Sequence, residues 1–231
     1  MPVKKPYRVP LRYRLTRFFL KPVFRGIFHI FADVAITGRE HIPFGRPYVV
    51  AINHISIFDP PFAGAFWPEQ LEVIGAADVF DKPGQGFILK AYGVIPVHRG
   101  DYDRILLVKI IHILRSGLPL LIAPEGGRSH SPAMKRAKPG VGYIIEQTGV
   151  PVLPVGLVGT TEDFWHRATH GDRPRLEMRI GKPIVFPAST SKGTERHTLR
   201  QQHTDLIMSH LAGLLPEEYR GEYAGSAIPP A

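Results

Sequence analysis

Residues 47–59 read PYVVAINHISIFD, and this stretch decides the fold. Its apolar run from Tyr48 to Ile52 does not alternate with polar residues, which predicts a strand buried on both faces. The run leads directly into Asn53 and His54, so the strand is expected to end at a polar loop. Strands buried on both faces are typical of parallel sheets that helices cover.

The rest of the chain repeats this pattern of apolar strands and helices. Strands are expected at 72–76, 94–97, 119–123, 152–158 and 176–180, and helices at 87–92, 101–116, 137–148 and 194–215. Because strands alternate with helices, the order predicts an α/β fold with a largely parallel central sheet covered by helices. We expect the domain to occupy residues 37–215, between a leader at 1–36 and a flexible tail at 216–231.

The leader concentrates positive charge. The chain has 29 basic residues, 20 acidic residues and no cysteine, which excludes disulfides and cysteine nucleophiles. Eight of the basic residues precede the first acidic residue, Asp33, so the remaining 21 basic and 20 acidic residues leave the body close to neutral. A basic leader suits anionic lipid headgroups or nucleic-acid phosphates, and the residues between the charges must distinguish the two.

Those residues are largely aromatic and aliphatic, which favours a membrane. Four cations recur at helical spacing, namely Arg14, Arg17, Lys21 and Arg25, while apolar residues cover another side of the same helix. We expect an amphipathic anchor that lies on the membrane surface, is kinked or divided at Pro22, and can be removed to leave a soluble core. The anchor is not expected to span the membrane, because no stretch of about 18 residues lacks charge. The alternative is a basic helix that packs its aromatic residues on the core.

Polar residues gather where predicted strands end, and ligands of open α/β sheets bind beyond these ends. His54 and Asp59 are close enough in sequence for the carboxylate to orient the imidazole, which makes His54 a candidate general base. The alternative is structural, with His54 capping a backbone group and Asp59 N-capping a helix that begins at Pro60.

Two further strand ends offer groups for an anion. The guanidinium groups of Arg99 and Arg128 match the oxygens of a phosphate, and Gly126 and Gly127 allow backbone N–H groups to approach it. Asp103, with Asp101, is expected to cap the following helix and not to bind a metal. The remaining histidines show no metal-ligand spacing, so no metal is expected.

Four blocks together resemble the glycerolipid acyltransferase family typified by 1-acylglycerol-3-phosphate acyltransferase. They are NHISIFD (53–59), GVIPVHR (93–99), APEGGRS (123–129) and VPVLPV (150–155), similar to the family's NH-x4-D, G-x-I-x-x-x-R, (F/V)PEG-x-R-S and proline-centred apolar blocks. The blocks occur in the family's order over roughly residues 37–160. The chain departs from the family at Gly127, where Thr is usual, and at Ala76-Ala77, where many members have a lysine.

The resemblance implies an enzyme that moves a fatty acyl group from acyl-CoA or acyl carrier protein to the sn-2 hydroxyl of lysophosphatidic acid. His54 would be the base and Asp59 its partner. The substrates would be bound by Asn53, Arg99, Glu125, Gly126, Gly127 and Arg128, with Pro154 on the acyl side. We expect no cofactor and no nucleic-acid partner, and a peripheral position on anionic lipids at the cytoplasmic face of the cell membrane.

Two alternatives stay open. The same chemistry could act on another lysophospholipid, an ornithine-lipid precursor or a glycolipid. A different class would be a non-catalytic, basic module that binds membranes or nucleic acid.

Overall fold

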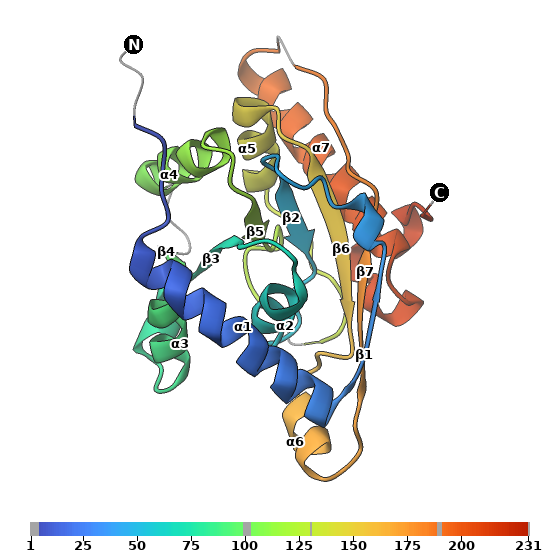
Figure 1. Ribbon diagram of the computed structural model, residues 1–231. Helices are drawn as coiled ribbons and strands as arrows, with labels where there is room; N and C mark the ends of the chain where they lie inside the picture. Colours follow the sequence, from blue (N-terminus) through green and yellow to red (C-terminus); the bar gives the residue numbers. More distant parts are fainter. Residues whose placement is uncertain (1–4, 99–102, 130, 189–190, 231) are drawn as a thin grey trace.

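The computed structural model describes residues 5–98, 103–129, 131–188 and 191–230 (Figure 1). Within these residues, seven strands form one sheet in the order β1-β7-β6-β2-β5-β3-β4. The strands are β1 (Asp33–Thr37), β2 (Val49–Ile52), β3 (Glu72–Ala76), β4 (Ile95–Val97), β5 (Leu120–Ile122), β6 (Val152–Val158) and β7 (Arg175–Ile180). Neighbouring strands are parallel except β6 and β7. The predicted α/β fold with a largely parallel sheet is confirmed.

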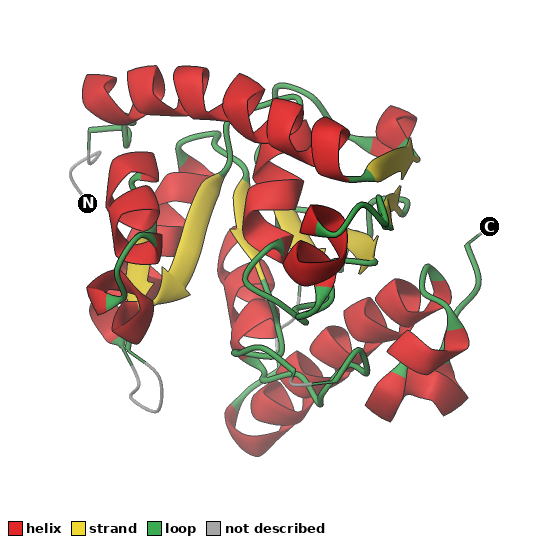
Figure 2. Ribbon diagram, turned by 90° about the horizontal axis from the view of Figure 1, so that it is seen from below, coloured by secondary structure: helices red, strands yellow, loops and turns green. Residues whose placement is uncertain are grey.

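Helices cover both faces of this sheet, as Figure 2 shows from below. They are α1 (Leu11–Phe31), α2 (Asp59–Phe66), α3 (Gln85–Tyr92), α4 (Arg104–Arg115), α5 (Gly140–Thr148), α6 (Phe164–Thr169) and α7 (Gly193–Gly213). Short 3-10 helices span η1 (Arg39–His41), η2 (Ala77–Asp81), η3 (Glu217–Tyr219) and η4 (Gly221–Ser226). The helices α1 and α2 pack on one face, and α4, α5 and α7 pack on the other.

The central strand β2 shows why its sequence lacks alternation. Val50 and Ile52 belong to the core that contains Phe62 of α2, whereas Val49 and Ala51 belong to the core on the opposite face. All four side chains are buried, with at most 1% exposed. Because both faces of β2 are covered by helices, every position in the strand has to be apolar.

The leader differs from the expectation in two respects. Its expected boundary after residue 36 falls inside β1, which pairs with β7 at the edge of the sheet. This short edge strand is only half-buried, so its sequence lacks a strong apolar signal. In addition, α1 continues through Pro22 as one helix, because contacts of Arg17 and Arg25 hold it to the domain on both sides of the proline.

The residues after 216 were expected to be flexible, but they pack against the domain. The tyrosines of η3 and η4 are buried, and the backbone N–H groups of Gly159 and Ala137 donate to Tyr219 and Tyr223 respectively. The expectation rested on the Glu, Gly and Pro content of this tail. Two buried aromatic side chains outweigh that composition.

Asp103 N-caps α4 as predicted, since its carboxylate accepts the N–H of Leu106 at 2.9 Å. Asp101 lies outside the described residues.

Candidate active site

The end of β2 is fixed by Asn53. Its side-chain oxygen accepts the N–H of Leu157 at 2.7 Å, and its amide donates to the Leu157 carbonyl at 2.9 Å. Both bonds reach β6, so the side chain extends the pairing of β2 and β6 by one residue. Asn53 is completely buried. We expected Asn53 to bind substrate; in the structure its side chain bonds to β6 and supports the residue that follows.

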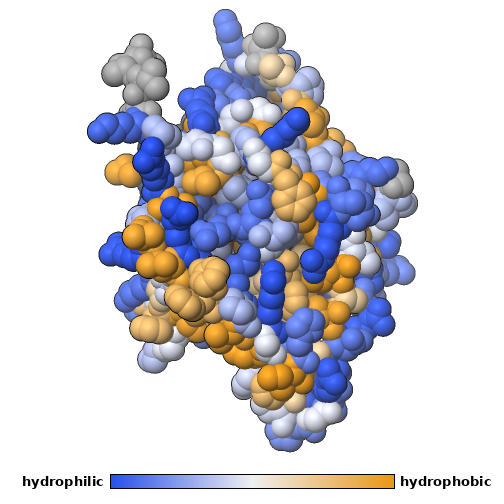
Figure 3. Space-filling model, viewed as in Figure 1, coloured by the Kyte–Doolittle hydropathy of each residue, from blue (hydrophilic) through white to orange (hydrophobic). Residues whose placement is uncertain are grey.

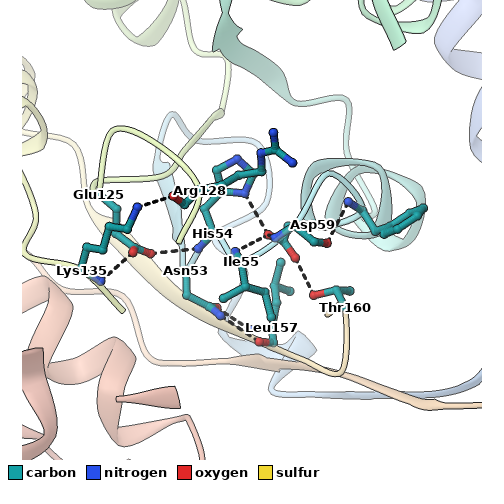
Figure 4. Close-up of polar contacts among 11 residues, drawn as sticks. Asn53, His54, Ile55, Asp59, Glu125, Arg128, Lys135, Leu157 and Thr160 are labelled. Carbon is teal, nitrogen blue, oxygen red and sulfur yellow. Dashed lines mark hydrogen bonds and ion pairs between the residues drawn. The ribbon is translucent and has the colours of Figure 1, made fainter. Parts of the chain in front are cut away.

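That residue is His54, and its imidazole meets Asp59. The distance from Nδ1 to Asp59 Oδ2 is 2.8 Å (Figure 4). The Asp59 carboxylate is buried, while 16% of the His54 side chain is exposed. With Nδ1 bonded to the carboxylate, Nε2 is the ring nitrogen left to accept a proton. The expected contact between the two residues is therefore present, and its catalytic role stays a prediction.

Asp59 is held by three other donors. Its Oδ2 atom accepts the N–H groups of Ile55 and Ser56, and its Oδ1 atom accepts the hydroxyl of Thr160. The alternative in which Asp59 N-caps the following helix does not hold, because Phe58 is at the N-cap and no side chain makes a capping hydrogen bond there. Thr160 was missed because it lies 101 residues further along the chain.

Glu125 supports His54 from the other side. Its carboxylate accepts the N–H of His54 at 2.9 Å and the N–H of Lys135 at 2.8 Å. The His54 carbonyl accepts the N–H of Ser129 at 2.8 Å, so the 125–129 loop binds both backbone groups of His54. Burial raises the pKa of Glu125, although the two N–H bonds lower it. Glu125 was expected to bind substrate, but its carboxylate faces the backbone and is 5% exposed.

The glycines of this loop leave room beside the His54–Asp59 pair, which we call the dyad. Gly126 has a left-handed φ of 72°, and a Cβ there would lie 3.2 Å from the Lys138 side chain. Gly126 and Gly127 line a cavity of about 100 Å³ together with His54 and Ala76. Ala76 presents no charge where many members of the resembled family have a lysine.

A larger groove of about 420 Å³ also reaches His54. Its walls are mainly apolar and come from α1, α2, α3 and the start of α6, with Phe24, Phe58, Leu89 and Trp165 among them. Polar side chains enter it at His54, Gln85 and Arg128. This arrangement can hold an acyl chain whose reactive end meets an imidazole and a cation. The walls from α1 and α6 were missed, because distant segments form them.

Pro154 was expected on the acyl side of the site, and Arg99 at the phosphate. Pro154 lies within β6 opposite Ala51 and is buried in the sheet. It is not among the described residues that line the groove. Its expected place on the acyl side is therefore not found. Arg99 lies outside the described residues. Among the described residues, no group of three or more His, Cys, Asp or Glu side chains could hold a metal ion.

The helix α1 turns part of its basic side toward the domain, which differs from the expectation that these cations face lipid headgroups. Arg17 is buried, Lys21 is half-buried, and both bond to the domain together with Arg25. The outer side carries exposed apolar residues, namely Leu11, Leu15, Phe18, Phe19, Val23 and Ile30, which are 51–68% exposed. Figure 3 shows a group of apolar side chains along this helix. None of the helices in the described part of the chain is long and apolar enough to span a membrane.

The alternative for α1, in which its aromatic residues pack on the core, describes one end of the helix. Phe28 is 2% exposed and contacts Phe62, with ring centroids 5.2 Å apart. Phe18 and Phe19 are more than 60% exposed. The helix is therefore both part of the domain and the carrier of an exposed apolar face.

The chain has a largely parallel sheet with polar loops at its strand ends, and its residues 33–158 match the acyltransferase family model. The chain belongs to the acyltransferase family. The predicted family and the predicted enzyme class, an O-acyltransferase, are thereby confirmed.

Relatives agree with this assignment. The chain is 25% identical over 221 residues to the lyso-ornithine lipid O-acyltransferase of Pseudomonas aeruginosa, covering 88% of this chain and 81% of the relative. It is 27% identical over 182 residues to human 1-acyl-sn-glycerol-3-phosphate acyltransferase alpha, covering 76% and 63%. Its match to the corresponding enzyme of Borreliella burgdorferi covers 53% of that protein's length.

The fold is shared with a solved structure. The 1-acyl-sn-glycerophosphate acyltransferase of Thermotoga maritima superimposes with a TM-score of 0.60 at 23% identity, covering 84% of this chain and 79% of that one.

Proposed function

We propose that the protein transfers a fatty acyl group from acyl-CoA or acyl carrier protein to the sn-2 hydroxyl of lysophosphatidic acid, giving phosphatidic acid. The observation that carries this proposal is the His54–Asp59 contact at the polar end of an apolar groove. Arg128 enters the same groove and supplies a positive charge for the phosphate.

The proposed reaction needs no covalent enzyme intermediate. His54 Nε2 accepts the proton of the acceptor hydroxyl while the hydroxyl oxygen attacks the thioester carbonyl. When the tetrahedral intermediate collapses, the C–S bond breaks and the imidazolium returns the proton to the thiolate. Asp59 stabilises the imidazolium and keeps Nε2 directed at the groove. We expect no metal or other cofactor to take part.

The exposed face of α1 supports a position on the membrane. The groove begins beside Phe24 and Ile27 of the same helix, so a lysolipid could enter it from a bilayer that contacts α1. We propose that the protein lies peripherally on the cytoplasmic face of the cell membrane. Flotation with anionic liposomes, compared with binding to DNA, tests this assignment against a nucleic-acid partner.

The central experiment measures acyl transfer from labelled acyl-CoA and acyl carrier protein to a panel of lysolipids, with the products identified by mass. His54→Ala should lower kcat by at least about 100-fold while the fold is kept, since base catalysis supplies effects of that size. Asp59→Asn should lower kcat nearly as much. Near-normal turnover by the His54 variant would exclude His54 as the base.

A lyso-ornithine lipid is the second candidate acceptor. Two observations favour it: the Pseudomonas enzyme matches more of this chain than the human one does, and Ala76 leaves part of the site uncharged. The substitution Arg128→Ala distinguishes the two candidate acceptors, lysophosphatidic acid and a lyso-ornithine lipid. It should weaken use of a phosphate-bearing acceptor by about 1.5–3 kcal/mol and affect the donor less. Lys182→Ala, which removes an exposed cation elsewhere, is the matched control.

A further inference from the structure

Lys21 and Arg25, one helical turn apart on α1, both donate hydrogen bonds to the end of α2. Lys21 Nζ lies 2.6 Å from the carbonyl oxygen of Trp67 and 3.2 Å from that of Glu69. Arg25 Nε lies 2.5 Å from the carbonyl oxygen of Ala65. These three carbonyls belong to the last turn of α2 and the residues directly after it. The two cations thus form a C-terminal cap that another helix provides.

The helix α2 depends on such support. It has eight residues, and no side chain caps its N-terminus. Isolated helices below about 12–15 residues are marginal in water, and the last four carbonyls of any helix lack partners within it. Cations at this end also interact favourably with the helix dipole. Phe28 of α1 packs against Phe62 and Phe66, so α1 fixes the side of α2 as well as its end.

The opposite end of α2 begins with Asp59, whose carboxylate contacts His54. Fewer than two turns of helix therefore separate the capped carbonyl of Ala65 from the carboxylate that orients the imidazole. The N–H groups of Ile55 and Ser56 and the Thr160 hydroxyl also hold the Asp59 carboxylate, so the cap acts together with these contacts. Without the cap, a displacement of the short helix along its axis would pull Asp59 against them and away from His54. The imidazole could not follow, because Glu125 and the N–H of Ser129 hold the His54 backbone from another loop.

We propose that Lys21 and Arg25 are positioning residues for the His54–Asp59 pair and act on it through α2. The inference rests on the proposed role of His54 as the base. It gives α1 a task separate from its exposed apolar face: one side of the helix sets the geometry of the dyad, and the other remains available to lipid.

The test compares substitutions that remove or keep the cap. In Lys21→Met/Arg25→Met, kcat should fall by about 10-fold or more, since a shift of about 1 Å can cost 100-fold in rate. KM for donor and acceptor should change by less than about threefold, because neither cation belongs to the polar end of the groove. Lys21→Arg and Arg25→Lys should restore most of kcat. Arg14→Met removes an exposed cation from the same helix and is the matched control.

A second measurement separates positioning from loss of fold or of function. The Nδ1 proton of His54 should give a downfield NMR signal in the wild type, because it is bonded to a carboxylate, and this signal should broaden or disappear in the double variant. It should persist in Arg14→Met. If the double variant does not fold, each single variant gives the same readout.

An unchanged His54 signal, or a kcat within twofold of wild type in a folded double variant, would overturn the proposal. An equal loss of kcat in Arg14→Met would do so too, since that loss would reflect membrane electrostatics. If the wild type acylates none of the lysolipids, the proposed function fails, whereas the NMR comparison still decides whether the cap positions the dyad.

Discussion

Arg17 of α1 and Glu72 of β3 form a buried ion pair, with 2.5 Å between Arg17 Nη1 and Glu72 Oε1 and only 1% of each side chain exposed. Tyr7 donates its hydroxyl to the same carboxylate, and Arg17 Nε donates to the carbonyl of Tyr92. The guanidinium also lies over the ring of Tyr92, 4.6 Å from its centroid. These contacts join α1 to the sheet and to α3, so the helix cannot be removed without exposing a buried charge.

We expect Arg17→Met to destabilise the fold by about 3–5 kcal/mol, because it leaves the Glu72 carboxylate buried without its partner. Urea unfolding measures the change. The double substitution Arg17→Met/Glu72→Leu should recover most of the loss, since it removes both charges from the interior. Arg14→Met, at an exposed position, should stay within about 0.5 kcal/mol of wild type. A similarly small effect of Arg17→Met alone would show that the pair does not hold α1.

This pair changes the expectation for a truncated protein. The sequence indicated that the leader could be deleted to give a soluble core. In the structure, deletion of residues 1–31 removes the partner of Glu72 and also Phe28, which belongs to the main core. We therefore expect the truncated chain to be insoluble or unfolded, and tests of membrane binding should use point substitutions in the full chain.

Glu125→Gln should lower both stability and turnover. The Glu125 carboxylate accepts two backbone N–H groups, but a glutamine side chain has one acceptor oxygen and would turn an NH₂ group toward the second N–H. The buried unsatisfied donor should cost about 1–3 kcal/mol. Loss of kcat should accompany it, because the backbone of His54 is one of the two groups held. Thermal unfolding and the transfer assay report the two effects, and a fully stable, active variant would contradict the assigned support.

Lys21 makes the stability dependent on pH. Burial, and then the nearby charge of Arg25, lower its pKa to about 8, although Glu69 opposes this change. The unfolded chain keeps the ordinary value near 10.5, so between pH 8 and 10.5 the unfolded state binds more protons than the folded state. The contribution of this group to stability must then rise with pH across that window.

The measurement is the unfolding free energy of wild type and Lys21→Met at several pH values from 7 to 10.5. The wild type should gain stability relative to the variant as pH rises, while groups common to both cancel. A constant difference would show that Lys21 keeps its ordinary pKa in the folded protein.

The sequence predicted the sheet well because a strand buried on both faces cannot contain polar residues, as Val49 to Ile52 illustrate. The contact of His54 with Asp59 was also predictable, since it is local. The residues that support this contact were harder to predict. Thr160 reaches Asp59 from beyond β6, and Glu125 bonds to the backbone of His54 although its motif suggested that it binds substrate. Periodicity indicated that α1 has two sides, but it could not tell which side faces the protein.

The orientation of α1 leads to the last prediction, which concerns how the protein binds membranes. Arg17, Lys21 and Arg25 are engaged with the domain, so they contribute less to headgroup binding than their number suggests. The exposed apolar residues of α1 should instead contribute most of the free energy of membrane binding. Full burial of a phenylalanine side chain contributes about 1.5–3 kcal/mol, whereas each basic residue near an anionic surface contributes about 1 kcal/mol and is screened by salt. Phe18→Ser/Phe19→Ser should therefore abolish most flotation with anionic liposomes at both low and high salt, and Arg8→Ser/Arg12→Ser should reduce it mainly at low salt. Both variants should unfold like the wild type, because all four side chains are exposed. Flotation that survives the phenylalanine substitutions but disappears in high salt would show that charge, and not the apolar face of α1, holds the protein on lipid.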